Sequence, residues 1–241
     1  MPGTRLTERL QDLLLDSELL EDFLRQLSDL AAGFASAETG RPMLCSVRAA
    51  TRHQPPVLAA SNAEARVLER LQDDVGEGPG LEAGQTGRGV MVPDTIMDPR
   101  WRRYQRAAAQ RGSRSILAVP LLVDRDAAAT LTLFSTSPEA FDDGALAVCG
   151  AFAGRAAKVT RLAIRLESAQ GINRDLLQAM RSRTEINLAT GILMAQSRCS
   201  QSDALAMLAR VSNTRNVKLR IIARQILHRF DGGQAGTGFG V

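Results

Sequence analysis

The sequence has 241 residues, 44% of them hydrophobic and 23% charged, which is typical of globular domains and excludes wholesale disorder or a fibrous repeat. This length fits two ordinary domains. No apolar run approaches the roughly 20 residues of a membrane span, and the N-terminus lacks the apolar core of a signal peptide, so we expect a cytoplasmic protein without a membrane partner. Cys45, Cys149 and Cys199 are far apart and lack CxxC spacing, which favours reduced thiols over disulfides or zinc ligands.

Charge is distributed unevenly along the chain. Residues 1–170 hold 20 basic and 22 acidic side chains, a net charge of −2, whereas residues 171–241 hold 10 and 4, a net charge of +6. A basic segment on a near-neutral body is typical of proteins that bind a polyanion, because phosphate neutralisation drives nucleic-acid affinity. The same charge also serves solubility, so the motifs must decide between the two interpretations.

The first two thirds of the chain mix helical and strand patterns. An apolar stripe at helical spacing predicts one helix from about Thr7 to Ala32. Short β-like runs follow at 43–48, 57–61, 90–93, 115–123 and 129–135, separated by helical stretches at 63–71 and 101–111 and a glycine-rich loop at 76–89. Because strands and helices do not alternate strictly, we expect an α+β domain with an antiparallel sheet.

From Gly144 to about Arg198 the sequence is helical and contains no proline. A pattern this long without caps indicates a coiled coil. Steps of three and four residues place the following on one seam: Val159, Leu162, Leu166, Ala169, Asn173, Leu176 and Met180. We favour a parallel homodimer, in which Asn173 fixes the register, over a single helix packed on its own domain, because Gly154 and Gly171 weaken an isolated helix.

Two shorter helices are predicted after Arg198. The first begins at Ser200, with Asp203 in a capping-box position, and the second carries apolar residues at helical spacing from Leu219 to Phe230. With the end of the long helix they make a three-helix unit. The glycine-rich tail, residues 232–241, is expected to be disordered.

The sequence lacks the patterns of common catalytic and cofactor sites. The segment 76–89 contains no GxxxxGK[ST] and no GxGxxG that opens a helix. His53 and His228 are the only histidines and lie in different predicted domains, which leaves neither a catalytic triad nor a two-histidine metal site. We therefore expect no enzyme, no cofactor and no metal.

The basic C-terminal segment offers a candidate nucleic-acid surface. Guanidinium, ammonium and amide groups bind phosphates and the base edges of unpaired RNA. The candidate residues fall into two groups, a polar stripe on the long helix and the start of the last helix: Arg183, Asn187 and Thr190, and Ser212, Asn213, Arg215, Asn216, Lys218 and Arg220. Helix caps and a solvated face explain the same residues structurally, and spacing alone leaves both interpretations open.

The strings SRTEINLATGILM (182–194) and DALAMLARVSNTRNVKLRIIA (203–223) resemble the ANTAR domain. The resemblance implies a dimeric RNA-binding protein that stabilises paired hairpins in nascent RNA against the competing terminator hairpin. The sequence departs from the family pattern at several positions: Thr190 stands where lysine is usual, Leu188 where glutamine is common, Leu205 where an aromatic is usual, and Asn213 replaces glutamine.

Upstream, GEGPGLEA (76–83), DPRW (98–101) and GSRSILAVPL (112–121) resemble the GAF domain that commonly precedes ANTAR. GAF domains sense a small molecule or simply dimerise, and both alternatives stay open. The resemblance implies a GAF-like sensor over residues 16–165 and a coiled coil with an ANTAR domain over 166–231. The alternative function is a ligand-sensing signalling protein whose helical C-terminus binds protein rather than RNA. A methionine sulfoxide reductase, which is an enzyme with this fold, needs cysteines that converge on one pocket, and the three cysteines here fall on separate elements.

Overall fold

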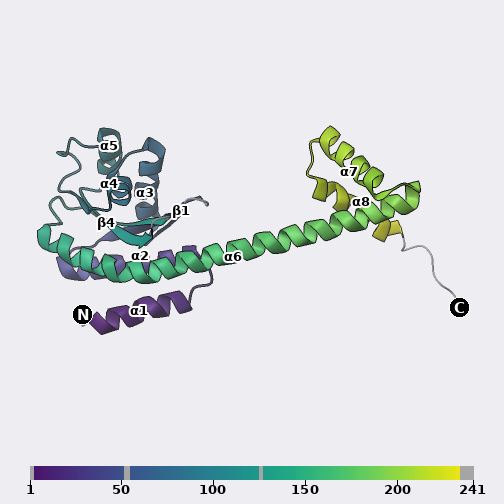
Figure 1. Cartoon of the computed structure of the whole chain (residues 1–241). Coiled ribbons are helices and arrows are strands. Elements are labelled where there is room, and N and C mark those ends of the chain that lie inside the picture. The colour runs from purple at the N-terminus through teal and green to yellow at the C-terminus, as the bar shows by residue number, and fades with distance from the viewer. Residues whose placement is uncertain (1–2, 52–54, 125–126, 234–241) are drawn as a thin grey trace. The chain divides into compact units, whose positions relative to one another are not determined.

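The computed structural model describes residues 3–51, 55–124 and 127–233 of the chain. The chain divides into two compact units, Met1–Ser168 and Ala169–Val241 (Figure 1). Within the described part of the chain, no helix combines the length and apolar character that a bilayer crossing needs.

The first unit is built on one antiparallel sheet with the strand order β2-β1-β5-β4-β3. Its strands are β1 (Leu44–Thr51), β2 (Val57–Ala60), β3 (Val90–Val92), β4 (Ser115–Asp124) and β5 (Ala127–Ser135). The long strands β4 and β5 form a hairpin in which Leu117 pairs with Leu133, and β1 lies on the far side of β5, where Val47 pairs with Leu131. The predicted α+β fold with an antiparallel sheet is confirmed.

Five helices precede the long helix within the described residues of this unit. They are α1 (Gly3–Leu15), α2 (Leu20–Thr39), α3 (Ala63–Val75), α4 (Pro79–Thr86) and α5 (Arg102–Gln110). The prediction of a single helix from Thr7 to Ala32 is wrong, because α1 ends at Leu15 and α2 begins only at Leu20. The Ser17 hydroxyl donates to the Leu13 carbonyl oxygen at 2.6 Å, and Leu19 is extended at φ −119° and ψ 150°.

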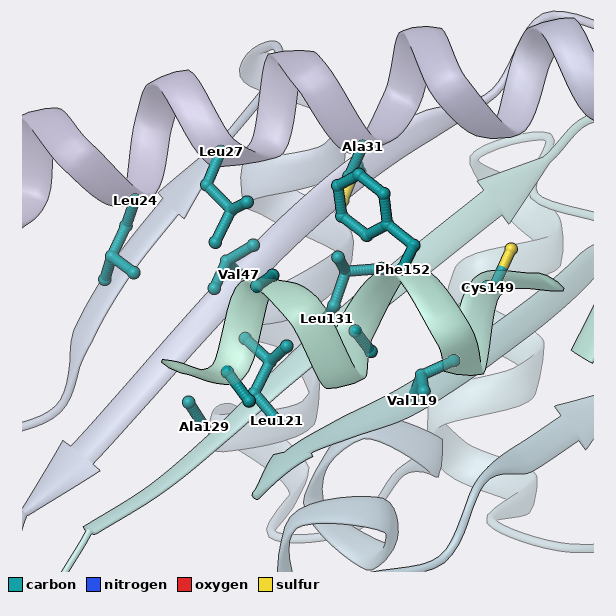
Figure 2. Packing of buried hydrophobic residues seen from close by; sticks show 14 of the residues in the cluster. Leu24, Leu27, Ala31, Val47, Val119, Leu121, Ala129, Leu131, Cys149 and Phe152 are labelled. Atoms are coloured by element: carbon teal, nitrogen blue, oxygen red, sulfur yellow. The ribbon is translucent and has the colours of Figure 1, made fainter. Parts of the chain in front are cut away.

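One sheet face is covered by α2 and the first turns of α6 (Asp143–Ser197). Alternate strand residues supply this core, because successive side chains point to opposite faces. Figure 2 shows Leu24 and Leu27 of α2 with Phe152 of α6 among strand residues such as Leu131. The Phe152 ring stacks on Phe34, with the ring centroids 5.0 Å apart.

The opposite face carries α3, α4 and α5 (Figure 1). The segment 76–89, expected as a loop, contains α4, so that prediction is wrong. Pro79 stands at the first helical turn and Gly87 closes the helix in the left-handed conformation at φ 67°. Proline is favoured in the first turn of a helix and glycine at its end. These two favourable residues offset the helix-weakening effect of the glycines inside α4.

The helix α6 spans 55 residues and takes part in both units. It begins where the Asp142 carboxylate accepts a hydrogen bond from the Ala145 N–H at 2.7 Å. Two helices follow, α7 (Gln201–Arg215) and α8 (Leu219–Gly233). The predicted capping box of Ser200 and Asp203 is present at the start of α7. The helix α8 extends into the predicted tail by two residues, and the rest of that tail lies outside the described residues.

All three cysteines are free. Cys45 of β1 and Cys149 of α6 are buried in the first unit, whereas Cys199 is half-buried at the turn between α6 and α7. Burial raises the pKa of the Cys45 thiol well above its ordinary value and raises the pKa of Cys149 to about 11.

Candidate nucleic-acid interface

The second unit is a bundle of three helices formed by the end of α6 with α7 and α8. Its buried core consists of Ala189, Leu208, Ile222 and Ala223. Ala189 comes from α6, Leu208 from α7, and Ile222 and Ala223 from α8, so each of the three helices contributes to this core. The predicted three-helix arrangement is therefore present, and its polar side chains can be placed.

The polar stripe on α6 divides into exposed and buried members. Arg183 and Asn187 lie about one helical turn apart, and both side chains are exposed. Thr190 is only 2% exposed, and its hydroxyl donates to the Ile186 carbonyl oxygen at 2.7 Å. The structure places Thr190 in the helical core rather than on the surface, because a hydroxyl that is satisfied by its own helix can be buried.

The turn between α7 and α8 uses several of the predicted residues for its own geometry. Asn216 ends α7 in the left-handed conformation at φ 49°, which asparagine adopts more readily than most residues. The Asn216 N–H donates to the Asn213 carbonyl oxygen at 3.2 Å, and the Ser212 hydroxyl donates to the Val217 carbonyl oxygen at 2.6 Å. The amide side chains of Asn213 and Asn216 are exposed and make no hydrogen bond within the described chain.

Three predicted cations surround this turn. Arg215 and Lys218 are exposed and Arg220 is half-buried. None of them forms an ion pair with another described residue. Guanidinium and ammonium groups without an intramolecular partner are available to phosphate oxygens, and the surface therefore presents positive charge beside two exposed amides.

An ion pair that sequence reasoning missed joins α8 to α6. The Arg224 guanidinium contacts the Glu185 carboxylate, with N–O distances of 2.9, 3.1 and 3.3 Å. At about 100° per residue, Glu185 lies roughly 160–200° around α6 from Asn187 and Arg183. No hydrogen bond or ion pair within the described residues joins Arg183 or Asn187 to 212–220, so a single face that combines them stays a prediction.

An exposed apolar stripe runs along α6. Its exposed fractions are 49% for Leu162, 47% for Leu166, 57% for Leu176 and 59% for Met180. The seam residues Ala169 and Asn173 are exposed as well, whereas Val159 packs in the core of the first unit at 9% exposure. Large apolar side chains at a 3-4 spacing on one exposed helix face are typical of a surface that a partner helix covers.

The first unit holds a buried polar cluster between the sheet and α3. The Glu69 carboxylate accepts hydrogen bonds from the Ser46 hydroxyl and the Gln72 amide, each at 2.8 Å. Its second oxygen has no partner within the described chain. Burial raises the pKa of Glu69, and the hydrogen bond from Ser46 opposes that rise. Sequence reasoning missed this cluster, although Ala65, Leu68, Glu69 and Gln72 share one helix face at core spacing.

The helix α4 closes over this cluster. The Gly80 N–H donates to the Gln72 side-chain oxygen at 2.7 Å. A Cβ at Gly80 would lie 2.8 Å from the Thr132 hydroxyl oxygen, and one at Gly84 would lie 2.8 Å from that of Thr130. Glycine at both positions therefore lets the α4 backbone approach the sheet directly.

A sheet covered by helices on both faces, followed by a long helix and a basic three-helix bundle, makes a two-domain architecture. The family model described as "GAF domain" matches residues 17–159, and the model described as "ANTAR domain" matches residues 174–227. The chain belongs to the GAF domain family and has the GAF-ANTAR architecture. A search of curated proteins finds no significant match.

Solved structures with similar chains include an N-acylhomoserine lactone dependent LuxR family transcription factor, CepR2 from Burkholderia cenocepacia. It is 17% identical, covers 69% of this chain and 97% of its own, and gives a TM-score of 0.49. The GAF domain of an Acinetobacter phosphoenolpyruvate-protein phosphotransferase is 18% identical, with coverages of 68% and 96% and a TM-score of 0.46. Free methionine-R-sulfoxide reductase from Neisseria meningitidis is 19% identical, with coverages of 68% and 90% and a TM-score of 0.46.

Proposed function

We propose that this protein is an RNA-binding transcription antitermination regulator that stabilises paired hairpins in nascent RNA. The observation that carries the proposal is the ANTAR match at 174–227, which covers the three-helix bundle and its exposed cations and amides. We expect the protein to act in the cytoplasm and not to be an enzyme.

Two physical features support RNA as the partner. The net charge of +6 over residues 171–241 favours a polyanion, and Arg183, Arg215 and Lys218 are exposed cations without intramolecular ion pairs within the described chain. Asn187, Asn213 and Asn216 add exposed amides, which can donate to and accept from base edges in an unpaired loop. Cations would hold the phosphates and amides would select the loop sequence.

Dimerisation through α6 is part of the proposal. Antitermination by paired hairpins needs two RNA-binding units, and the apolar stripe from Leu162 to Met180 supplies the seam that would bring two copies together. A ligand of the GAF domain would gate RNA binding only if it binds two states of the dimer with different affinities. The helix α6 contributes to the cores of both units and is the element through which such coupling would pass.

The proposal is tested by fluorescence anisotropy titration of the full-length protein with RNA hairpins, taken from transcripts that crosslink to it, at several salt concentrations. Lys218→Ala should weaken binding to every hairpin and lower the salt slope by about 1. Lys158→Ala is the matched control, because Lys158 and Lys218 are the two lysines of the chain, both exposed, and Lys158 lies outside the ANTAR domain. Absence of any hairpin preference in the parent protein would contradict the proposal.

A protein partner is the alternative function, and one observation favours it. Ile221 and Phe230 of α8 are each 43% exposed, and apolar surface of this kind also suits a protein contact. Salt distinguishes the two functions. Binding to RNA weakens steeply as ionic strength rises, whereas an apolar protein contact does not.

A further inference from the structure

The middle of α6 exposes more apolar surface than the seam residues alone account for. Ile172 is 71% exposed and Leu177 is 49% exposed, although neither is a seam residue. The seam residues Leu176 and Met180, which lie within the same stretch of the helix, are 57% and 59% exposed. Large apolar side chains that gather on an exposed helix mark a surface that a partner covers.

These four apolar side chains lie on one face of α6. At about 100° per residue they span an arc of about 140°, with Ile172 at one edge and Leu177 at the other. Asn173 falls inside this arc, and its side chain is exposed. The described side chains of the opposite arc include the exposed Gln178 and Arg181. Residues 172–181 therefore form an amphipathic segment, and its apolar face takes no part in the hydrophobic cores of the two units.

The seam fixes the heptad position of each residue in this segment. Seam residues occupy the a and d positions, where two helices meet, and Asn173 occupies an a position. Ile172 directly precedes Asn173 and therefore occupies a g position. Leu177 directly follows Leu176, which occupies a d position, and therefore occupies an e position. The e and g positions flank the seam and commonly carry charged side chains, so apolar side chains at both flanks widen the surface that a second helix can cover.

The widened face is complementary to itself. When two copies of a helix run parallel and in register, a g residue of one copy lies beside the next e residue of the other copy. Ile172 of one copy then contacts Leu177 of the second copy, and two-fold symmetry repeats this contact on the other side of the seam. The neighbouring pairs of the same kind bring no like charges together: Arg165 with Gln170, and Ala179 with Thr184.

We propose that Ile172 of one copy and Leu177 of a second copy form an apolar contact that holds two α6 helices parallel and in register. The inference rests on the dimer of the proposed function and adds what selects its orientation. The contact covers both flanks of Asn173, so the two Asn173 amides meet in an apolar layer and pair with each other. A shift by one heptad would place each amide against Leu166 or Met180, where it would lack a polar partner. Antiparallel helices set g residues beside g residues, so Ile172 and Leu177 would not meet.

Charge substitutions test this contact by sedimentation equilibrium of the full-length protein. Ile172→Lys and Leu177→Glu should each raise the dimer dissociation constant about tenfold, because each buries a charge against an apolar side chain. The double variant should return the constant to within about threefold of the parent value, since parallel helices bring the introduced ammonium of one copy to the introduced carboxylate of the other. Antiparallel helices would keep the two introduced charges apart, and the double variant would then dimerise more weakly than either single variant.

The controls place the same charges on the polar face of the helix. Gln178→Lys and Gln178→Glu should leave the dimer dissociation constant unchanged, because Gln178 is exposed and lies away from the seam. A dimeric parent whose double variant is weaker than both single variants overturns the contact and leaves the dimer of the proposed function standing. A parent that is monomeric at every concentration overturns both. A parent mass of four copies, or single variants that dimerise as tightly as the parent, shows that Ile172 and Leu177 do not meet in a dimer and overturns the contact alone.

Discussion

Gly80 lies so close to buried side chains that one added methyl group should lower the stability of the first unit. A Cβ there would lie 2.8 Å from the Thr132 hydroxyl oxygen and 2.9 Å from the Gln72 amide nitrogen, both of which are buried. We expect Gly80→Ala to lower the free energy of unfolding by about 1–3 kcal/mol, because overpacking forces buried neighbours to shift. Urea denaturation measures the change.

Gly33 supplies the matched control for that experiment. It lies inside α2, is exposed, and a Cβ there would meet no atom within 4 Å. Gly33→Ala should raise the free energy of unfolding by about 0.5–1 kcal/mol, since alanine restricts the unfolded chain more than glycine does. Similar stability of the two variants would contradict the close approach of α4 to the sheet.

Glu69 should make stability depend on pH in an unusual direction for a carboxylate. Its pKa is raised by burial in the folded protein, so the folded state keeps the proton to higher pH than the unfolded state. The free energy of unfolding should therefore fall as the pH rises from the ordinary glutamate pKa through the raised folded value. Each pH unit in that window contributes up to about 1.4 kcal/mol.

The Glu69→Gln variant isolates this effect from the other titrating groups. Asp94 and Asp98 have lowered pKa values through hydrogen bonds from Arg114 and Arg100, so they stabilise the fold above the ordinary aspartate pKa and lose that contribution in acid. These contributions cancel when the variant is compared with the parent protein. The stability of Glu69→Gln relative to the parent should increase with pH, and a difference independent of pH would contradict an ionisable, buried Glu69.

A variant that tests the Asn216 side chain must tolerate the left-handed backbone conformation of this residue. Because its φ is 49°, replacement by alanine adds about 1–2 kcal/mol of left-handed strain to the loss of the amide. Asn216→Gly removes the amide without that strain. If Asn216 reads a base, the glycine variant should narrow the difference in binding free energy between cognate and loop-mutated hairpins by about 1–3 kcal/mol, measured by anisotropy. An unchanged difference would assign Asn216 to the turn alone.

At the scale of elements, most of the correctly predicted helices and strands followed from the spacing of apolar residues along the sequence. The strands were recognisable as short runs rich in apolar and β-branched residues, and the long helix by its helical spacing without proline from 144 to 198. The basic three-helix bundle followed from the same periodicity together with the cap at Ser200.

The errors arose where a contact distant in sequence decides the local structure. Residues 79–86 were predicted as a loop because they contain glycines. Those glycines instead allow α4 to pack closely on Thr130 and Thr132 of β5. Thr190 read as a surface residue because a hydroxyl is polar, but its helix satisfies that hydroxyl and the bundle buries it. The Glu185–Arg224 ion pair needs the bundle to exist before the two charges meet.

The exposed apolar stripe of α6 should be a dimer seam. Replacing Leu166 and Leu176 together with glutamate should convert the dimer to a monomer, because two copies would otherwise bury like charges against each other. Both side chains are about half exposed, at 47% and 57%, so the fold of a single chain should change in stability by about 0.5 kcal/mol or less. Sedimentation equilibrium measures the mass.

The control for the seam adds the same charge elsewhere on the helix. Gln170 and Gln178 are exposed and lie outside the seam positions, so the double change Gln170→Glu and Gln178→Glu should leave the mass unchanged. A dimer that survives the leucine substitutions would reject the seam.

At the scale of the whole molecule, α6 contributes to two hydrophobic cores, one near each of its ends. The segment of α6 between those ends belongs to neither core. Phe152 and Ala156 pack on the sheet and Ala189 packs in the bundle, whereas Ile172, Leu176 and Met180 are 71%, 57% and 59% exposed. Gly171 falls within this intermediate segment and disfavours an isolated helix by about 1 kcal/mol. The intermediate segment therefore depends most on a second copy, and dimerisation and helical order there should rise and fall together.

The burial of two of the three thiols makes the chain selectively modifiable by chemical labelling. With a pKa of about 11, Cys149 is a thiolate in roughly one molecule in ten thousand at neutral pH, and Cys45 is fully buried. A maleimide dye should therefore attach at Cys199, which is half-buried at the turn between α6 and α7. The unmodified sequence thus carries its own attachment point for a dye at the edge of the ANTAR bundle.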